Sequence, residues 1–322
     1  MENILEVRNL HTYFYLENSI VKAVEGVSFN LTKGEVLGMV GESGCGKSVT
    51  AYSIINLIDK PGKVGEGEVI FDKKDLLKIS QNQLRHIRGK DISLIFQEPH
   101  AALNPVYTVG FQIAETIKAH HKNINQKDLK KRVEELLLKV GLSSDKKNSY
   151  PHNLSGGEAQ RVMIAQSLSC NPKILIADEP TTALDVTVQA KIIELFKKLQ
   201  KEENFSLIFI THDLTLCSQI ADRVAVMYAG QLVELAGLAK IIKEPLHPYT
   251  QALFASLPQK EKRKERLAAI GGDVPDPDRK PKGCFFNPRC KIKEDNCLDK
   301  QPKLKEIEEG HWVRCFKREG RR

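Results

Sequence analysis

Short apolar runs separated by glycine turns and by segments of helical periodicity make up most of the chain. Runs of this kind, when bounded by turn signals, are typical of buried strands. They lie at residues 35–40, 92–96, 173–177, 206–210 and 223–228. Helical periodicity follows the first run and separates the third run from the fourth. Strands that alternate with helices predict an α/β fold with a largely parallel sheet covered by helices.

The amino-terminal part shows alternation of apolar and polar positions instead. Residues 4–10 alternate as an edge strand does, and residues 11–15 continue the strand with aromatic side chains. Residues 21–31 are expected to form a strand-pair region, with turns at Gly26 and Gly34. Several strands are therefore expected before the first helix.

Glycines and helical spacing mark the next two segments. Gly62, Gly65 and Gly67 predict a turn that leads into a strand at residues 68–71. Residues 98–165 are then helical in character, and we expect them to form an inserted subdomain. The helices expected within it lie at residues 110–120 and 127–140, the second ending at Gly141.

The pattern of residue types along the chain changes again near residue 245. Residues 244–250 open a short helix that reaches about residue 257, and residues 260–266 form a charged run. Residues 271–282 are rich in Gly, Pro and Asp, as in a linker or a wrapped loop. We place a domain boundary between residues 1–256 and residues 257–322.

The octapeptide Gly-Glu-Ser-Gly-Cys-Gly-Lys-Ser at residues 41–48 matches the phosphate-binding pattern G-x-x-x-x-G-K-[ST] at every specified position. It lies between a predicted strand and a predicted helix, so its backbone N–H groups and the helix N-terminus can face an anion. Lys47 is expected to reach the β- and γ-phosphates of a nucleotide, and Ser48 to ligate Mg²⁺. A chance glycine-rich turn is the alternative. The other nucleotide contacts expected here are Gly41, Ser43, Gly44, Cys45, Gly46 and Val49.

Two adjacent carboxylates follow the apolar run at residues 173–177. Asp178 suits the Mg²⁺ coordination shell, and Glu179 suits a general base that polarises the attacking water. Since Pro180 follows, the pair could instead cap a helix. His212 follows the next strand and is expected to contact the γ-phosphate, although a lone histidine would usually be structural.

Residues 154–158, Leu-Ser-Gly-Gly-Glu, form a second turn of the anion-binding type. Ser155, Gly156 and Gly157 open a helix, which directs backbone N–H groups at an anion. Two phosphate-binding turns in one chain are explained most simply if each nucleotide is shared between two subunits.

With these motifs in their order and spacing, the chain resembles the ATP-binding cassette (ABC) ATPases over about residues 4–256. The resemblance implies a P-loop NTPase domain with a RecA-like core, an antiparallel β subdomain and a helical subdomain inserted at about residues 98–165. It also implies a head-to-tail dimer, in which ATP lies between the octapeptide of one subunit and residues 155–157 of the other. The residues that carry it are the octapeptide at 41–48, Gln97, residues 154–158, residues 174–179, residues 183–185 and His212.

The same resemblance implies further roles. Gln97 would join the Mg²⁺ site and sense a transmembrane partner, and Asp185 would communicate across the dimer. An aromatic ring would stack on adenine. Phe14 aligns best with that role, with Tyr13 and Tyr15 as alternatives.

A narrower resemblance covers the C-terminal segment. Residues 244–250 and 283–290, with residues 177–189, are similar to the ATPases of bacterial oligopeptide and dipeptide importers, including their C-terminal extension. This implies an ATPase subunit that drives peptide import from the cytoplasmic face of the membrane. Two membrane-spanning permeases, a second related ATPase and an external peptide-binding protein would complete the importer. Nickel importers share the extension, so nickel or another solute stays open.

Four of the seven cysteines crowd the C-terminal segment, at the spacing C-x₅-C-x₆-C-x₁₇-C. In a cytosolic protein such a cluster favours metal binding over disulfides. Zinc sites favour short C-x₂₋₄-C pairs, which are absent. Some relatives of the extension carry a [4Fe–4S] cluster on four such cysteines, so we expect that cluster, with Zn²⁺ or no metal as alternatives. The expected ligands are Cys284, Cys290, Cys297 and Cys315.

Cys45 stands where related loops usually carry serine. A thiol at a helix N-terminus favours the thiolate form, which is the reactive one. We therefore expect oxidation or alkylation of Cys45 to block ATP binding.

Charge and composition change this picture little. Net charge is +8, and residues 1–257 carry 30 Lys and Arg against 29 Asp and Glu, so the excess lies in the C-terminal segment. A basic C-terminal segment allows an alternative function, that of a soluble ABC ATPase that acts on nucleic acid or ribosomes. Proteins of that kind usually carry two cassettes, a long coiled coil or zinc insertions, so no nucleic-acid partner is expected. A binding-only cassette is also disfavoured, since Lys47, Asp178, Glu179 and His212 are all present.

The sequence also lacks two features that would direct the protein into or across a membrane. No apolar run approaches the roughly 18–20 residues of a membrane span. The N-terminus has neither a basic region nor a long apolar run, so no secretory signal is expected.

Overall fold

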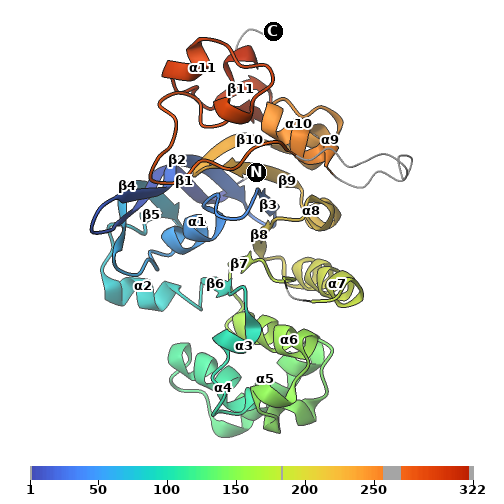
Figure 1. Cartoon of the computed structure of the whole chain (residues 1–322). Helices are drawn as coiled ribbons and strands as arrows, with labels where there is room; N and C mark the ends of the chain where they lie inside the picture. Colours follow the sequence, from blue (N-terminus) through green and yellow to red (C-terminus); the bar gives the residue numbers. More distant parts are fainter. Residues whose placement is uncertain (1, 183, 257–269, 319–322) are drawn as a thin grey trace. The chain divides into compact units, whose positions relative to one another are not determined.

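The computed structural model describes residues 2–182, 184–256 and 270–318, and the chain divides into two compact units (Figure 1). The first, the P-loop unit, comprises residues 1–32, 36–77 and 211–322. The second, the helical unit, comprises residues 33–35 and 78–210. The charged run at residues 260–266 lies outside the described residues.

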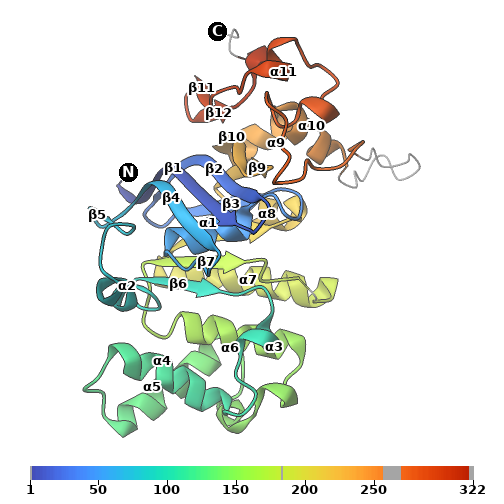
Figure 2. The same ribbon diagram turned by 60° about the vertical axis from the view of Figure 1, so that its left-hand side comes forward.

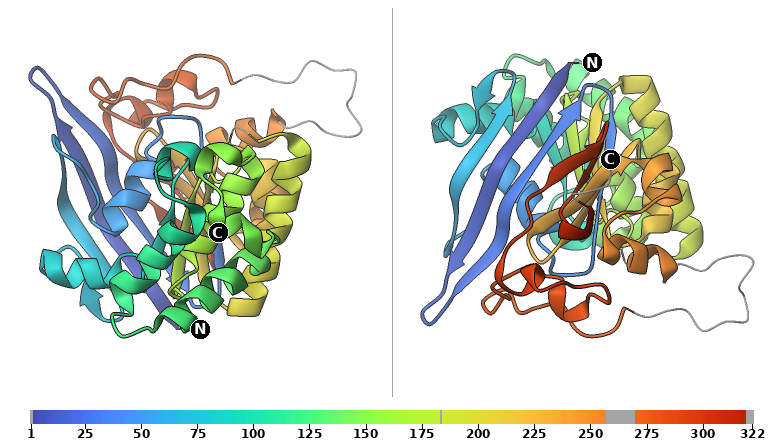
Figure 3. Two further views of the ribbon diagram at one scale, coloured as in Figure 1. Left: turned by 90° about the horizontal axis from the view of Figure 1, so that it is seen from below. Right: turned by 90° about the horizontal axis from the view of Figure 1, so that it is seen from above.

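An antiparallel four-stranded sheet forms one layer of the P-loop unit, with its long strands side by side in Figure 3. Its strand order is β2-β1-β4-β5. The strands are β1 (Asn3–Tyr15), β2 (Ile20–Thr32), β4 (Gly62–Phe71) and β5 (Lys74–Asp75). The prediction of an edge strand at the N-terminus was wrong, because β1 pairs with β2 on one side and with β4 on the other.

Glycines predicted as turns lie inside two of these strands. Gly26 belongs to β2, where it adopts a φ of +67° at an irregular register between β1 and β2. The extra residue of such a bulge often needs positive φ, which glycine adopts without a steric penalty. Likewise Gly62, Gly65 and Gly67 belong to β4. The turn signals here therefore marked bulged strands rather than chain reversals.

The second sheet of the P-loop unit joins the core to the C-terminal extension. Its strand order is β11-β12-β10-β9-β3 within this unit. β3 and β9 run parallel, whereas β10, β11 and β12 extend the sheet with antiparallel pairs. The strands are β3 (Val36–Val40), β9 (Arg223–Tyr228), β10 (Gln231–Gly237), β11 (Lys305–Glu308) and β12 (His311–Val313). The extension thus contributes strands to the sheet that contains β3.

Helices complete the P-loop unit. The helix predicted after the octapeptide is α1 (Lys47–Ile54), and the helix opened by residues 244–250 is α10 (Pro248–Ala255). The remaining ones are α8 (Leu214–Ile220), α9 (Leu238–Lys243), α11 (Asn296–Asp299) and the short 3₁₀ turns η3 (Asn287–Arg289) and η4 (Phe316–Arg318).

The helical unit contains three parallel strands in the order β8-β7-β6. Along the chain, helices lie between β6 and β7 and between β7 and β8. The predicted helical region is confirmed, and α4, α5 and α6 pack together in Figure 2 around buried side chains such as Ile113, Leu137 and Ile164. The strands are β6 (Ile92–Ile95), β7 (Ile174–Asp178) and β8 (Ser206–Thr211). The helices are α2 (Gln81–Ile87), α3 (Pro99–Ala102), α4 (Val109–His120), α5 (Gln126–Lys139), α6 (Gly156–Ser167) and α7 (Val186–Glu203), with 3₁₀ turns η1 (Ser144–Asn148) and η2 (Pro151–Asn153).

Among the described residues, none of the helices is both long enough and apolar enough to cross a bilayer. α7, the longest, is amphipathic: Ile192, Phe196 and Leu199 are buried on one side, and charged residues follow the other. This is the pattern of a helix packed on a protein core.

Candidate functional site

The octapeptide forms the loop between β3 and α1. Gly41, Gly44 and Gly46 have φ values of +156°, +76° and +99°, which non-glycine residues rarely adopt. A Cβ on Gly46 would lie 2.4 Å from the carbonyl oxygen of Ala23. The backbone therefore requires glycine at this point, and it brings the loop directly to the start of a helix.

Lys47, the first residue of α1, points back into the loop. Its side chain is almost fully buried. The Nζ ammonium donates hydrogen bonds to the carbonyl oxygens of Gly41 at 2.8 Å and Glu42 at 3.1 Å. A buried ammonium held within a loop of backbone N–H groups is suited to bind an anion there.

The expectation that the Cys45 thiol favours the thiolate form was wrong, whereas the predicted effect of its modification on ATP binding stays a prediction. The side chain is fully buried, with no exposed surface. Burial raises the pKa of the Cys45 thiol, and the neighbouring Lys47 ammonium offsets only part of this effect. In a buried site the desolvation of the thiolate outweighs the helix N-terminus.

In the helical unit, Asp178 and Glu179 lie at the carboxyl end of β7, as predicted. Asp178 is fully buried and Glu179 nearly so. The Glu179 carboxylate accepts hydrogen bonds from Gln97 Nε2 at 3.2 Å and from Thr182 Oγ1 at 3.0 Å, both to Oε2. The structure therefore brings Gln97 and Glu179 together, whereas Thr182 was missed by the sequence analysis. A polar side chain three residues after a candidate base was the available signal.

The alternative of a helix cap for this carboxylate pair is wrong. The next helix, α7, begins at Val186, and its cap is Asp185, which accepts a hydrogen bond from the backbone N–H of Val188 at 2.9 Å. The side chain of Asp185 is otherwise exposed. Ala183, the first residue of the predicted motif at 183–185, lies outside the described residues.

The turn that the sequence predicts to be a second anion-binding one begins α6. Ser155 caps the helix, and the N–H of Ser155 donates to Glu158 Oε2 at 3.0 Å while the N–H of Glu158 donates to Ser155 Oγ at 3.3 Å. A Cβ on Gly157 would lie 2.7 Å from Val188 Cγ1, so this glycine allows α6 to approach α7 closely. The turn lies at the surface of the helical unit.

His212 and Phe14 both belong to the P-loop unit. His212 is exposed, and it directly precedes Asp213, which caps α8 by accepting hydrogen bonds from the N–H groups of Thr215 and Leu216. Phe14 is half-buried near the end of β1, and its ring lies beside Gly62. Their predicted roles stay predictions.

The sequence analysis missed Glu42 within the octapeptide, its partners Tyr249 and Arg289, and Glu234. Glu42 was treated as an unspecified position of the motif, yet its backbone N–H donates to Tyr249 Oη at 3.0 Å, and its carboxylate binds Arg289. Tyr249 belongs to the segment at residues 244–250 that carried the narrower resemblance. Glu234 orders the start of that segment, since its carboxylate accepts hydrogen bonds from the N–H groups of Leu246 and His247.

The four C-terminal cysteines line one small cavity with His247 and Phe286. Burial raises the pKa of the Cys284 thiol to about 11, and the other three thiols also raise it. Across the parts of the chain that are described, however, no group of three or more His, Cys, Asp or Glu side chains is arranged to hold a metal ion. The cysteines are thus gathered at one cavity without metal-binding geometry.

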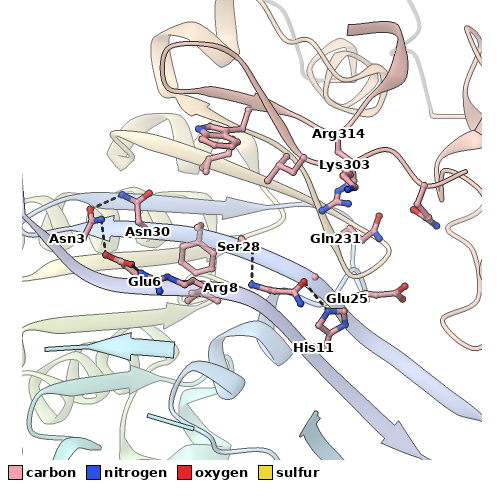
Figure 4. Close-up of a pocket in the computed structure, with 18 residues that line it drawn as sticks. Asn3, Glu6, Arg8, His11, Glu25, Ser28, Asn30, Gln231, Lys303 and Arg314 are labelled. Atoms are coloured by element: carbon pink, nitrogen blue, oxygen red, sulfur yellow. Dashed lines mark hydrogen bonds and ion pairs between the residues drawn. The ribbon is translucent and has the colours of Figure 1, made fainter. Parts of the chain in front are cut away.

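A larger cleft of about 680 Å³ lies between the four-stranded sheet and the extension (Figure 4). Arg314 and Lys303 of the extension line one side, and Glu25 and His11 line the other. The Arg314 guanidinium donates to the carbonyl oxygens of Leu232 and Pro302. The contact with Leu232 ties the extension to β10, and residues 41–48 do not line the cleft.

Comparison with known proteins agrees with this arrangement. A family described as ABC transporter matches residues 24–182, and one described as oligopeptide/dipeptide transporter, C-terminal region, matches residues 233–297. The oligopeptide transport ATP-binding protein AppD of Bacillus subtilis is 50% identical over 98% of this chain and 97% of its own. The dipeptide transport ATP-binding protein DppD of Escherichia coli is 46% identical over 97% of this chain and 96% of its own.

Solved structures give the same result for the fold. A dimer of the ATP-binding cassette MJ0796 in a post-hydrolysis state with ADP and Pi is 30% identical, with a TM-score of 0.66. The match covers 73% of this chain and 98% of that one. The chain therefore belongs to the ATP-binding subunits of the oligopeptide and dipeptide branch of ABC transporters, and it is an ATPase.

Proposed function

We propose that the chain is the ATP-hydrolysing subunit that powers the import of dipeptides or oligopeptides. The observation that carries this proposal is the similarity to AppD and DppD over nearly the whole chain, C-terminal extension included. The cassette alone would support an ABC ATPase of any kind. The extension narrows the proposal to importers of the peptide type.

In the proposed reaction the loop at residues 41–48 binds the triphosphate of ATP. Lys47 exchanges its hydrogen bonds to the Gly41 and Glu42 carbonyls for bonds to phosphate oxygens, which balances the charge of the phosphates. Ser48, Gln97 and Asp178 would hold Mg²⁺, which neutralises charge on the β- and γ-phosphates when bound. Phe14 would stack on adenine.

Glu179 would act as the general base. The contacts of Gln97 and Thr182 orient the Glu179 carboxylate, which would accept a proton from the attacking water. His212 would contact the γ-phosphate and orient this water. The roles of these residues follow from chemistry and from the resemblance, and they are open to test.

We further propose that two ATPase subunits dimerise head to tail at the cytoplasmic face of the membrane. Residues 155–157 would complete the nucleotide site of the partner subunit. Asp185 would communicate between the two subunits of the dimer. Support comes from the exposed position of the turn at the start of α6 and from the solved dimer of MJ0796. Two permeases would receive the motion of the helical unit, and an external peptide-binding protein would deliver the solute.

We also propose a [4Fe–4S] cluster, with Zn²⁺ as the alternative, on Cys284, Cys290, Cys297 and Cys315. The donor set fits, because four thiols line one cavity, and four thiolates are the usual ligands of such clusters. The four thiols would have to close on the metal and lose their protons, which burial opposes at Cys284, Cys290 and Cys315 by raising their pKa values. The cluster would cross-link a segment with little core of its own. Iron, zinc and acid-labile sulfide analysis of protein purified without oxygen tests this.

The experiment that tests the importer is affinity purification of the tagged chain from detergent-solubilised membranes, followed by identification of what accompanies it. Two multi-span permeases and a related ATPase are the expected companions. Uptake of labelled dipeptides, oligopeptides and Ni²⁺ by vesicles containing that complex then identifies the solute. Recovery with ribosomes or DNA and without a membrane protein would overturn the proposal.

A further inference from the structure

One side chain of the C-terminal extension reaches the phosphate-binding loop. Arg289 Nη1 donates to Glu42 Oε2 at 2.7 Å, and Nη2 donates to Glu42 Oε1 at 3.0 Å. Two parallel N–H···O bonds of this kind form the bidentate pair that an arginine fork makes with a carboxylate. Both residues belong to the P-loop unit, although 247 positions separate them in sequence.

The arginine is itself fixed in place. Its side chain is only 3% exposed, and Nε donates to the carbonyl oxygen of Gly271 at 3.1 Å. The guanidinium lies 5.7 Å from the centre of the Tyr228 ring, which is packed against Tyr249 and Phe286. The Glu42 carboxylate raises the pKa of Arg289 above its already high value, so the guanidinium stays charged. A buried, oriented guanidinium cannot leave Glu42 without losing several contacts.

Glu42 is correspondingly held at three points. Its N–H donates to Tyr249 Oη at 3.0 Å, its carbonyl oxygen accepts from Lys47 Nζ at 3.1 Å, and its carboxylate binds Arg289. A carboxylate in this loop would otherwise repel a triphosphate bound to the same loop. Arg289 balances that charge and fixes the carboxylate on the side of the extension.

We propose that Arg289 is a positioning residue for ATP binding, which acts through Glu42 and makes the loop at residues 41–48 depend on the folded extension. Arg289 ends the 3₁₀ turn η3, and the next residue, Cys290, lines the cysteine cavity together with Cys284, which lies three residues before the turn. The fold of the cysteine segment therefore sets where the guanidinium lies. The proposal rests on the ATPase activity and is independent of the solute imported.

The test compares ATP hydrolysis and equilibrium binding of a fluorescent ATP analogue in full-length variants. Arg289→Ala leaves the Glu42 carboxylate without its charged partner, so the KM for ATP should rise roughly ten-fold while kcat at saturating ATP changes by less than about two-fold. Arg289→Lys keeps the positive charge but cannot form the bidentate pair, so its KM for ATP should lie between those of wild type and Arg289→Ala. Glu42→Gln removes the repelling charge, and its amide oxygen can still accept one hydrogen bond from Arg289, so KM should rise by less than in Arg289→Ala.

The double variant Glu42→Gln with Arg289→Ala discriminates between electrostatic and merely structural roles. Because no unbalanced carboxylate remains, its KM should lie closer to wild type than that of Arg289→Ala alone. A double variant as impaired as the single one, or a KM that Arg289→Ala does not change, would overturn the proposal. Arg318→Ala is the matched control, since this extension arginine donates to the carbonyl oxygen of Leu246 instead. Far-UV circular dichroism confirms that each variant is folded.

Discussion

Glu179 is the side chain on which turnover should depend most directly. Gln97 and Thr182 both donate to Oε2 of its carboxylate, which orients the group proposed to take a proton from water. Glu179→Gln keeps the shape and both contacts but removes the base. We expect ATP affinity within about three-fold of wild type and turnover reduced by roughly 100-fold or more.

Steady-state hydrolysis and equilibrium nucleotide binding check this expectation. Glu202→Gln is a suitable control, because this exposed residue on α7 forms a long ion pair with Lys198, at 3.9 Å. Turnover at the wild-type rate in Glu179→Gln would show that another group activates the water.

Cys45 should react slowly despite its place at the start of α1. Burial raises the pKa of its thiol, and only the thiolate is a good nucleophile. We expect N-ethylmaleimide to leave Cys45 unmodified in the native chain, as followed by mass spectrometry of its peptide, and to modify it rapidly in denaturant. Equal rates in the two conditions would contradict the buried position.

At the scale of elements, the extension depends on one close approach of two backbone segments. A Cβ on Gly283 would lie 2.1 Å from the carbonyl oxygen of Cys297 and 2.6 Å from that of Leu298, so Gly283→Ala must displace backbone. We expect the free energy of unfolding to fall by about 1–3 kcal/mol. Urea denaturation measures this value, and Gly271→Ala, where a Cβ meets open space, should match wild type.

The elements best predicted from sequence are the buried strands and the helices of the helical unit. β3, β6, β7, β8 and β9 are continuous apolar runs, and such runs have few alternatives in a chain of this size. The predictions failed where pairing across the sheet decides the structure. Alternation along β1 is the same for an edge and an inner strand, and Gly26 signals a bulge as readily as a turn.

The sequence predicts the residues that would bind phosphate, but not the contacts that hold their loop in place. The motif fixes Lys47 and the glycines because phosphate binding demands those residue types at that spacing. Nothing local to the sequence pairs Glu42 with Arg289, since the pair depends on β12 joining β10 and on η3 packing beside Tyr228. β12 has only three residues, too few for a periodic signal. The boundary proposed between residues 256 and 257 stays a prediction.

For the whole molecule, the proposed cluster predicts a stability that depends on metal. A group that binds only the folded extension stabilises the folded state by mass action. Protein purified without oxygen should be brown, absorbing near the boundary of the visible and ultraviolet, and should unfold at a higher temperature than protein stripped by oxidation and chelation. Each kcal/mol corresponds to roughly 2–4 °C in a chain of this size class.

Cys297→Ser is the variant that separates the cluster from general damage. Its side chain lines the cavity and is nearly buried, and serine is close in size but a poor cluster ligand. Loss of the colour and of the stability difference is expected. A colourless wild-type chain that contains neither iron nor zinc, and that unfolds at the same temperature before and after chelation, would exclude a metal in this cavity.

The separation of Glu42 and Arg289 in sequence also has a consequence for biosynthesis. The two residues are 247 positions apart, so at 5–20 residues per second the ribosome makes Arg289 roughly 12–50 s after Glu42. The loop that binds phosphate is thus among the earliest parts of the chain to be synthesised and among the latest to be finished. A nascent chain that stops before residue 289 carries the complete octapeptide without the arginine that balances its charge.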